Sequence, residues 1–317
     1  MAIVTNTMLE ALRVGFRADF EEGKAKAQPQ WQLAATHVPS SSASNTYGWL
    51  GQFPKLKEWI GNRVFQDIAE HEYTVANKLY EATVSIPLTA IEDDELGVYK
   101  PLYLEMGYAA AVHPDELVFK LLAEGHTTKC SDGHNFFDTA HVIYENEDGS
   151  GAETTVSNSL SPTVSGVKNV VVDPVAPWFL LDVSRPLRPL LFQERSLPEL
   201  QVITNPENEH VFTTDSIPFG VRYRCNAGYG FWQMAVRSTE PLNAESFERS
   251  LMTIRGFTAD GGRPLGLGRG GKEGLVLVVP SVHLASARKV IAAERLDNGS
   301  SNIWYDSATI IDCPWLG

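Results

Sequence analysis

Residues 59–125 set the architecture; they read WIGNRVFQDIAEHEYTVANKLYEATVSIPLTAIEDDELGVYKPLYLEMGYAAAVHPDELVFKLLAEG. Apolar and polar side chains alternate through residues 57–68 and again through 73–84, with the polar turn Glu70-His71-Glu72 between the two runs. This period of two predicts a long β-hairpin. A hairpin has too little core to stand alone in water. We therefore expect it to lie on a surface that the same chain or a neighbouring copy supplies.

Residues 96–124 show helical periodicity instead. Apolar residues recur at spacings of three and four, and charged residues fall mostly between them. Gly125 ends the run, and Pro114 indicates either a kink or the first turn of a second helix. At about 1.5 Å per residue the run would span roughly 40 Å. A helix of this length is expected to act as a spine.

The composition is that of a globular protein, with 317 residues, 43% of them hydrophobic and 21% charged. No apolar run approaches the roughly 18 residues of a membrane helix, and the N-terminal residues lack the order of a signal peptide, so we expect synthesis in the cytosol.

The formal net charge of −13 disfavours tight binding to nucleic acid. Cys130, Cys225 and Cys313 are widely spaced and odd in number, which favours reduced, buried thiols.

The rest of the chain divides by pattern. Residues 1–27 pattern as an amphipathic helix and 28–47 as an extended segment, and together they predict an N-terminal arm that reaches across another surface. The composition of residues 126–175 predicts surface turns without regular elements. Strand patterns follow at 178–183, 189–195, 200–203, 217–225 and 230–237. Beyond residue 238, helical patterns (243–255, 284–294) alternate with strand patterns (275–280, 303–312), which indicates a separate α/β unit.

Two motifs invite a chemical interpretation. The segment 126–141 holds a dense set of metal-ligand side chains: His126, Cys130, Asp132, His134, Asp138 and His141. Their spacing matches no closed zinc motif, so a turn-rich loop with surface histidines is favoured over a metal site. Gly266, Gly271 and Lys272 spell GxxxxGK, but Glu273 stands where magnesium needs a hydroxyl and a strand pattern follows, which indicates a loop and not a nucleotide site. No nucleophile elbow or paired carboxylates are present in the sequence, so it offers no active site.

Candidate interface residues come from the hairpin and from the strand-rich region. The hairpin contributes Trp59, Val64, Phe65, Ile68, Tyr73 and Val75. The strand-rich region interleaves arginines with aromatics and contributes Arg188, Glu194, Arg195 and Trp232. A nucleic-acid surface uses such a mixture, but the neighbouring glutamates favour ion pairs between subunits, and the tryptophan is expected to anchor a core or an interface.

A family resemblance is spread over nearly the whole chain. It is carried by SASNTYGWLGQFPKLKEWIG (42–61), YTVANKLYEATVSIPLTAIEDDELGVY (73–99), HPDELVFKLLAEG (113–125), CSDGHNFFDTAH (130–141), PLLFQERSLPEL (189–200), AGYGFWQMAV (227–236) and PLGLGRGGKEGLVLVVPSVHLASARKVI (264–291). These stretches, in this order, resemble the major head subunit of Mu-like phages and prophages. That family is similar in fold to the major capsid proteins of the Hong Kong 97 type.

The resemblance implies an α+β, Hong Kong 97-like capsid fold. Its expected parts are an N-terminal arm (1–47), an extended hairpin loop (48–87), a peripheral domain (88–237) with the spine helix 96–124 and the loop-rich insert 126–175, and an axial α/β domain (238–317). It also implies a virion protein that is assembled in the bacterial cytoplasm and has neither enzymatic activity nor a cofactor. Copies would form hexamers and pentamers of an icosahedral head around double-stranded DNA, without sequence-specific contact and without a membrane. The expected partners are a portal, a decoration or cement protein, and a scaffold that comes from another chain.

Two other functions remain as alternatives. A cellular compartment shell of the same fold would enclose a cargo protein instead of a genome. A metal-dependent hydrolase would use the 126–141 cluster, and stoichiometric zinc together with an activity that is lost on Cys130→Ala would identify it.

Overall fold

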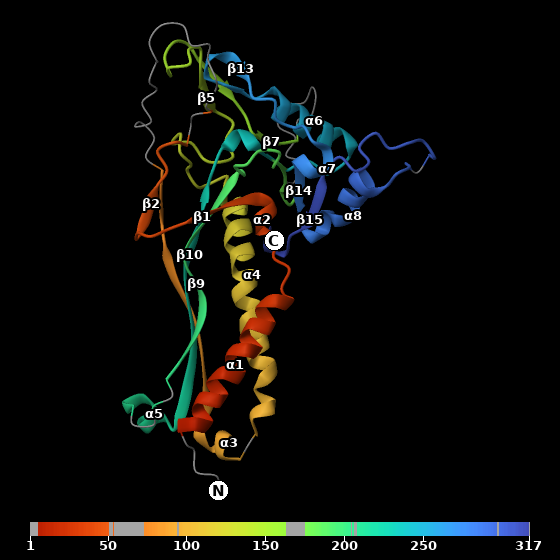
Figure 1. Cartoon of the computed structure of the whole chain (residues 1–317). Helices are drawn as coiled ribbons and strands as arrows, with labels where there is room; N and C mark the ends of the chain where they lie inside the picture. The colour runs from red at the N-terminus through yellow and green to blue at the C-terminus, as the bar shows by residue number, and fades with distance from the viewer. Residues whose placement is uncertain are drawn as a thin grey trace.

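The computed structural model describes residues 6–50, 53, 73–93, 95–162, 175–203, 205, 208–296 and 298–316. Its longest helix, α4 (Lys100–Glu124), runs lengthwise through an elongated lobe (Figure 1). The helix passes through the buried Pro114 without ending, and Gly125 caps it. The predicted spine is therefore one helix, preceded by a 3-10 turn, η1 (Glu95–Val98). It begins later than expected because Pro101 lacks the N–H that an interior position would need and is tolerated only in the first turn.

A twisted sheet of long strands lies along α4 (Figure 1). Its order is β1 (Ala35–Pro39), β9 (Leu190–Val202), β10 (Ser216–Tyr229) and β4 (Lys78–Pro87), with β1 parallel to β9 and the other pairs antiparallel. In β10, buried residues such as Phe219 and Tyr223 alternate with more exposed ones such as Arg222. The predicted strands 189–195 and 200–203 form the single strand β9. Its register against β10 shifts near Pro198, as expected where proline removes a ladder hydrogen bond.

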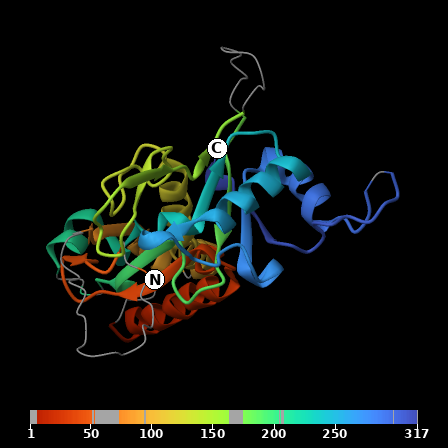
Figure 2. The same ribbon diagram turned by 90° about the horizontal axis from the view of Figure 1, so that it is seen from above.

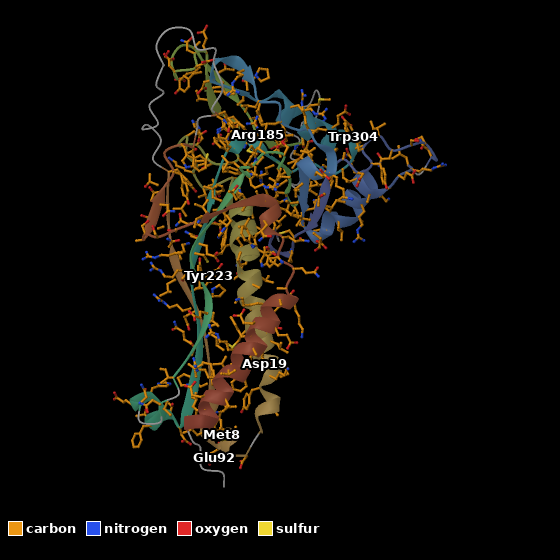
Figure 3. All side chains as sticks on the ribbon, in the orientation of Figure 1. Met8, Asp19, Glu92, Arg185, Tyr223 and Trp304 are labelled. Atoms are coloured by element: carbon orange, nitrogen blue, oxygen red, sulfur yellow. The ribbon has the colours of Figure 1, made fainter. Side chains whose placement is uncertain are left out.

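Helix α1 (Asn6–Lys26) packs against α4 of its own chain. Phe16 stacks on Tyr103 with ring centroids 4.1 Å apart, and Leu9 and Phe20 are fully buried in the same cluster. Lys100 pairs with Asp19 of α1 at 3.2 Å, and Figure 3 shows Asp19 midway along the elongated lobe. The predicted helix is confirmed, but this arm does not reach away from its subunit, because its apolar face is covered by the subunit's own spine. Residues 28–47 are not extended throughout: a single turn, α2 (Trp31–Ala34), precedes β1.

The return strand of the predicted hairpin is present, but its described partners are different from those expected. It forms β3 (Thr74–Ala76), paired with β2 (Ser44–Thr46), and β4, paired with β10. The predicted outgoing strand, 57–68, lies outside the described residues.

A second sheet forms the broader upper part of the molecule. Its order is β15 (Thr309–Asp312), β14 (Leu275–Val279), β8 (Trp178–Asp182), β11 (Ala235–Ser238) and β7 (Ser159–Leu160). Helices α6 (Ala244–Gly256) and α8 (Leu284–Ala287) accompany it, and seen from above the 284–312 region projects to one side (Figure 2). The boundary expected at residue 238 is not a boundary of this sheet. β14 pairs with β8, and β8 pairs in turn with β11, so segments from before residue 238 complete the sheet.

Short elements complete the fold. The insert 126–175 was predicted to hold turns only, but it contains β5 (His141–Tyr144) and β6 (Glu153–Val156), joined through positive-φ glycines at 149 and 151. The remaining elements are α3 (Leu88–Glu92), α5 (Glu209–Thr214), α7 (Gly271–Gly274) and the pair β12 (Thr258–Ala259) and β13 (Arg263–Pro264). The three cysteines are free and buried, as predicted. None of the described helices is long and apolar enough to cross a membrane.

Candidate intersubunit surfaces

Strands β2 and β3 bring Tyr47 and Tyr73, which flank the segment 48–72, next to each other. The Tyr47 backbone N–H donates to the Tyr73 carbonyl oxygen at 2.8 Å, and the hydroxyls of Thr46 and Thr74 are 2.9 Å apart. Strands β2 and β3 therefore act as a clasp that holds the two ends of the segment together. Because both strands are fixed to the subunit, the clasp also fixes where the segment emerges.

Buried contacts anchor this clasp. The Tyr73 hydroxyl accepts a hydrogen bond from the Tyr229 backbone N–H at 2.9 Å, and Val75, only 4% exposed, packs against Gly228, where a Cβ would lie 2.5 Å from it. The Gln193 side chain donates to the Val75 carbonyl oxygen at 3.2 Å. Two of the interface candidates, Tyr73 and Val75, are thus part of the subunit interior. The other hairpin candidates, Trp59, Val64, Phe65 and Ile68, lie outside the described residues.

The outgoing end is anchored as well. Phe53 packs on Phe231 with ring centroids 4.3 Å apart, and its carbonyl oxygen accepts a hydrogen bond from the Arg263 guanidinium at 2.7 Å. The Arg185 guanidinium lies over the Phe53 ring at 5.3 Å, and Figure 3 places Arg185 where the elongated lobe meets the upper part. The segment therefore starts from a fixed position at this junction.

The face of the long sheet that points away from α4 is polar with apolar patches. Arg222 lies between Glu81 of β4 and Glu199 of β9 in the strand register, but Glu199 pairs instead with Arg17 of α1 at 3.3 Å. Arg224 lies opposite Leu79, which is 60% exposed. Within the described ranges, the side chains of Arg195, Arg222 and Arg224 have no ion-pair partner. We call these three residues the arginine group.

Glu194 and Arg188 are occupied inside the subunit. The Glu194 carboxylate accepts a hydrogen bond from the Tyr223 hydroxyl at 2.7 Å and lies 2.9 Å from Nε2 of His37. Burial raises the pKa of Tyr223, so its hydroxyl stays protonated as a donor. Arg188 donates from its guanidinium to the Val183 carbonyl oxygen at 2.8 Å. Glu194 thus already has two partners within its own subunit, and its ion pair with a neighbouring subunit stays a prediction.

Trp232 belongs to the core of the insert. It is 5% exposed and stacks on His141, with ring centroids 3.9 Å apart and planes at 6°. Of the six potential ligands in 126–141, the structure brings Cys130, Asp132 and His141 together. His126 instead contacts the Ala123 carbonyl oxygen at 3.0 Å, and His134 lies on the outer side, 4.0 Å from Asp138.

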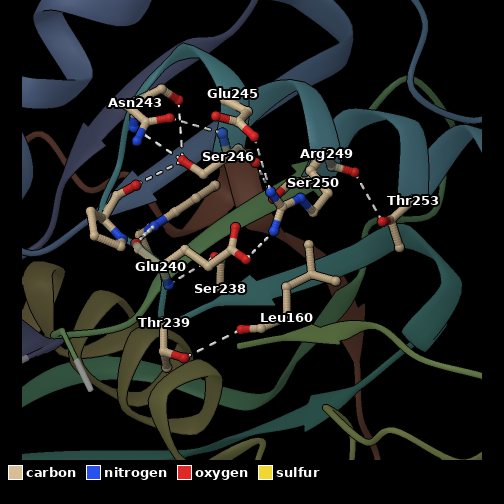
Figure 4. A network of polar contacts seen from close by, with 12 residues as sticks. Leu160, Ser238, Thr239, Glu240, Asn243, Glu245, Ser246, Arg249, Ser250 and Thr253 are labelled. Carbon is tan, nitrogen blue, oxygen red and sulfur yellow. Dashed lines mark hydrogen bonds and ion pairs between the residues drawn. The ribbon is translucent and has the colours of Figure 1, made fainter. Parts of the chain in front are cut away.

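A polar network fixes α6 to the edge of the second sheet (Figure 4). Asn243 and Ser246 form a reciprocal capping box, with both bonds at 3.0 Å, which satisfies two N–H groups at the start of the helix. Glu240 is 4% exposed and pairs with Arg249, and its carbonyl oxygen accepts from Nε1 of Trp178 at 2.8 Å. Burial raises the pKa of the Glu240 carboxyl, and Arg249 opposes this shift.

The GxxxxGK stretch has the geometry of a loop. Gly266, Gly268, Gly270 and Gly271 have positive φ, and Lys272 pairs with Asp306 at 3.0 Å. A phosphate-binding loop leads into the N-terminus of a helix, whereas this stretch passes through the four-residue helix α7 directly into strand β14. The predicted loop is confirmed.

The sequence patterns did not predict that several large apolar side chains are exposed. Phe212 of α5 is 84% exposed at the far end of the elongated lobe, and Ile303 is 80% exposed in the C-terminal region. A single aromatic in the polar stretch EHVFTT (209–214) could have indicated the first. Singly exposed apolar side chains are common on protein surfaces, but at these exposures both are candidates for contact with a neighbouring subunit.

Known proteins of one family are similar to this chain over nearly its whole length. The family "Mu-like prophage major head subunit gpT" matches residues 9–316. The major capsid protein of Escherichia phage Mu is 42% identical over 302 residues, covering 95% of this chain and 94% of that protein. The Mu-like prophage FluMu major head subunit of Haemophilus influenzae is 41% identical over 299 residues, covering 94% of each.

The fold of the chain is also similar to that of subunits in solved phage capsids. The procapsid of bacteriophage JBD30 matches with a TM-score of 0.85 and 47% identity, covering 98% of this chain and 100% of that one. The JBD30 capsid matches with a TM-score of 0.75 and 36% identity, covering 100% of both chains. The mixed helix-and-strand fold is thus shared with phage capsid proteins. The chain belongs to the family of Mu-like prophage major head subunits.

Proposed function

We propose that this chain is the major capsid protein of a Mu-like phage and that its copies assemble as hexamers and pentamers into an icosahedral head around double-stranded DNA. The observation that carries this function is the match to one family of head subunits from residue 9 to residue 316, together with the likeness to solved procapsid and capsid subunits. The protein is thus a component of the phage head.

We further propose the Hong Kong 97-type arrangement. The N-terminal arm (1–47) and much of the peripheral domain (88–237) would form the elongated lobe, residues 48–87 the extended loop and its base, and residues 238–317 most of the axial domain. The long sheet packed on α4, and a second sheet with its own helices, support this division. Because β8 and β11 belong to the second sheet, the axial domain would include them.

The extended loop would lie on the outer sheet face of a neighbouring subunit. Trp59, Val64, Phe65 and Ile68 are its proposed apolar contacts, and Asp67, Glu70 and Glu72 would supply charge opposite the arginine group. Unpaired guanidinium groups on a partly apolar face suit such a contact, because charge complementarity sets register and partner choice. Many modest contacts of this kind, repeated around a closed shell, would give a stable particle.

The other proposed partners are a separate scaffold, a portal and a decoration protein. One related structure is a JBD30 capsid decorated with minor capsid protein trimers, which supports a partner of that class here. The net charge of −13 would let packaged DNA move without being gripped. We propose no enzymatic activity and no cofactor for catalysis.

A loop replacement tests this function. Residues 54–71 would be replaced by a Gly-Ser linker of about eight residues, which can reach roughly 27 Å when extended. The variant keeps Phe53 and Tyr73, so the clasp and the subunit fold should survive while shell assembly with the scaffold is lost. A deletion that continued through Val75 would be a poor test, because it would remove buried core.

Thermal unfolding of the purified variant provides the control for folding, and negative-stain microscopy and particle mass measure assembly. Wild-type-like shells from the variant would contradict the proposed role of the loop. A wild-type chain that stays a single compact subunit, with and without its scaffold, would contradict the capsid function itself.

A further inference from the structure

Three potential metal ligands converge at the base of the insert. The ligand atoms of Cys130, Asp132 and His141 all lie within 4.8 Å of one another. Cys130 lies in the loop that follows α4, and His141 is the first residue of β5. Cys130 is 6% exposed, and His141 has no exposed surface. The cluster thus joins the start of the insert to its first strand, with two ligands buried and the Asp132 side chain 24% exposed.

The backbone holds the first two ligands in a tight turn. The Cys130 N–H donates to the His134 carbonyl oxygen at 2.8 Å, and the Gly133 N–H donates to the Cys130 carbonyl oxygen at 3.2 Å. Gly133 has a φ of +81°, which glycine adopts without steric cost. The His134 N–H also donates to Oδ1 of Asp132 at 3.0 Å. This turn brings the thiol and the carboxylate together before any ligand arrives.

His141 is fixed from the other side. Its ring stacks on Trp232, and its Nδ1 lies 2.6 Å from Oδ2 of Asp132. The Cys130 thiol donates to the other carboxylate oxygen, Oδ1, at 3.1 Å. The carboxylate therefore holds on its two oxygens the Cys130 thiol, which becomes a metal ligand when it loses its proton, and Nδ1 of His141, which becomes one when the proton of the neutral ring is on Nε2.

We propose that Cys130, Asp132 and His141 form a structural site for a zinc-class divalent ion. Zinc accepts sulfur, imidazole nitrogen and carboxylate oxygen together at about 2.0–2.3 Å, whereas calcium and magnesium take oxygen ligands. One thiolate and one carboxylate balance the two positive charges, so the filled site is neutral, as a buried site requires. Binding displaces a proton from the thiol.

The fourth position is open to water or to His134. The His134 ring centroid lies 6.0 Å from that of His141, and its side chain is 37% exposed, so it can turn toward the ion. Through the stacked Trp232, the ion would hold the insert against the subunit core. This inference concerns the stability of the subunit and does not depend on how the shell assembles.

Cobalt(II) titration of the full-length, chelator-treated subunit tests the site. A thiolate ligand gives Co²⁺ a charge-transfer absorption band, so the expected result is that band, saturating at about one ion per subunit, with zinc displacing the cobalt. Cys130→Ser should abolish the band. Asp132→Asn should weaken binding at least about tenfold, since even groups outside the ligand shell change metal affinity by roughly 10–100-fold.

Cys313→Ser is the matched control. Cys313 is also buried, at 1% exposure, but it belongs to no ligand cluster among the described residues, so its replacement should leave the band intact. The proposal is overturned if wild-type protein gives no charge-transfer band, if Cys130→Ser retains it, or if Cys313→Ser loses it. Should Cys130→Ser fail to fold, titration of the wild type and Asp132→Asn decides alone, with equal affinities counting against the site.

Discussion

Substituting alanine for Gly107 should separate α1 from the spine helix. The two helices cross at glycines: a Cβ on Gly107 would lie 2.0 Å from the Phe20 carbonyl oxygen, and one on Gly23 would lie 2.0 Å from that of Leu104. Both clashes are with backbone, so no side chain can move aside to relieve them. The helices would have to part by more than about 1 Å to reach van der Waals contact, at roughly 3.5 Å.

The expected magnitude follows from two opposing effects. Alanine in place of glycine in a helix stabilises by about 1 kcal/mol, while forcing atoms into a packed contact costs about 1–3 kcal/mol or more. Parting the helices also loosens the Phe16–Tyr103 stack and the buried Phe20. Because the clash involves backbone, we expect the cost to lie at the upper end, about 3 kcal/mol, which leaves a net loss of about 2 kcal/mol in the free energy of unfolding of the subunit.

Gly15→Ala is the matched control on α1. Nothing lies within 4 Å of a Cβ at Gly15, so only the gain in helix propensity remains, and the variant should be more stable by about 0.5–1 kcal/mol. Urea unfolding of both variants, followed by tryptophan fluorescence, gives the comparison. If Gly107→Ala were as stable as Gly15→Ala, the close helix crossing would not be a feature of the folded subunit.

Three further predictions concern the polar networks and the exposed surface. Arg249→Met leaves the buried Glu240 without its partner and should cost about 1–3 kcal/mol, the lower figures reflecting that Arg249 is half exposed. The loss should be larger at pH 8 than at pH 5. Arg249 opposes the rise that burial gives the pKa of Glu240, so its removal raises the native-state pKa further above the unfolded-state value, and the variant loses more stability than the wild type as the pH rises through that window. Urea unfolding at the two pH values checks this, and equal losses would refute it. Asn158→Leu removes bonds to the Phe136 carbonyl oxygen (2.7 Å) and from the Asp138 N–H (2.9 Å) and should cost about 2–4 kcal/mol, whereas Asn298→Leu, in an exposed turn, should cost almost nothing in the same assay. Phe212→Ser should leave subunit stability within about 0.5 kcal/mol but reduce the yield of shells; undiminished yield would show that this side chain makes no subunit contact.

Much of the fold was predictable because the patterns are local. The spine helix, the return strand 73–84 and the two central strands of the long sheet, β9 and β10, follow from side-chain periodicity, whereas β1 gave no strand pattern; the caps at Gly125 and Asn243 are set by single residues. The start of the spine was misplaced by the few residues that Pro101 excludes.

The errors arise where distant segments meet. Nothing near residue 238 shows that β14 pairs with β8, about a hundred residues earlier in the chain, or that α1 is covered by its own spine. Glu194 was assigned to a neighbouring subunit because His37 and Tyr223, its partners, are remote in sequence. The insert strands were missed because four-residue elements between glycines give too short a periodic signal.

The clasp between β2 and β3 separates the length of the 48–72 segment from the stability of the body that carries it. Because the Tyr47 N–H is hydrogen-bonded to the Tyr73 carbonyl oxygen, an insertion after Phe53 leaves both flanking strands in place, and the entropic cost of closing a longer loop rises by only about 0.6 kcal/mol for each doubling of length. Foreign peptides could therefore be displayed from this position, and heads of different relatives could vary the reach of the segment, while the rest of the polypeptide folds unchanged.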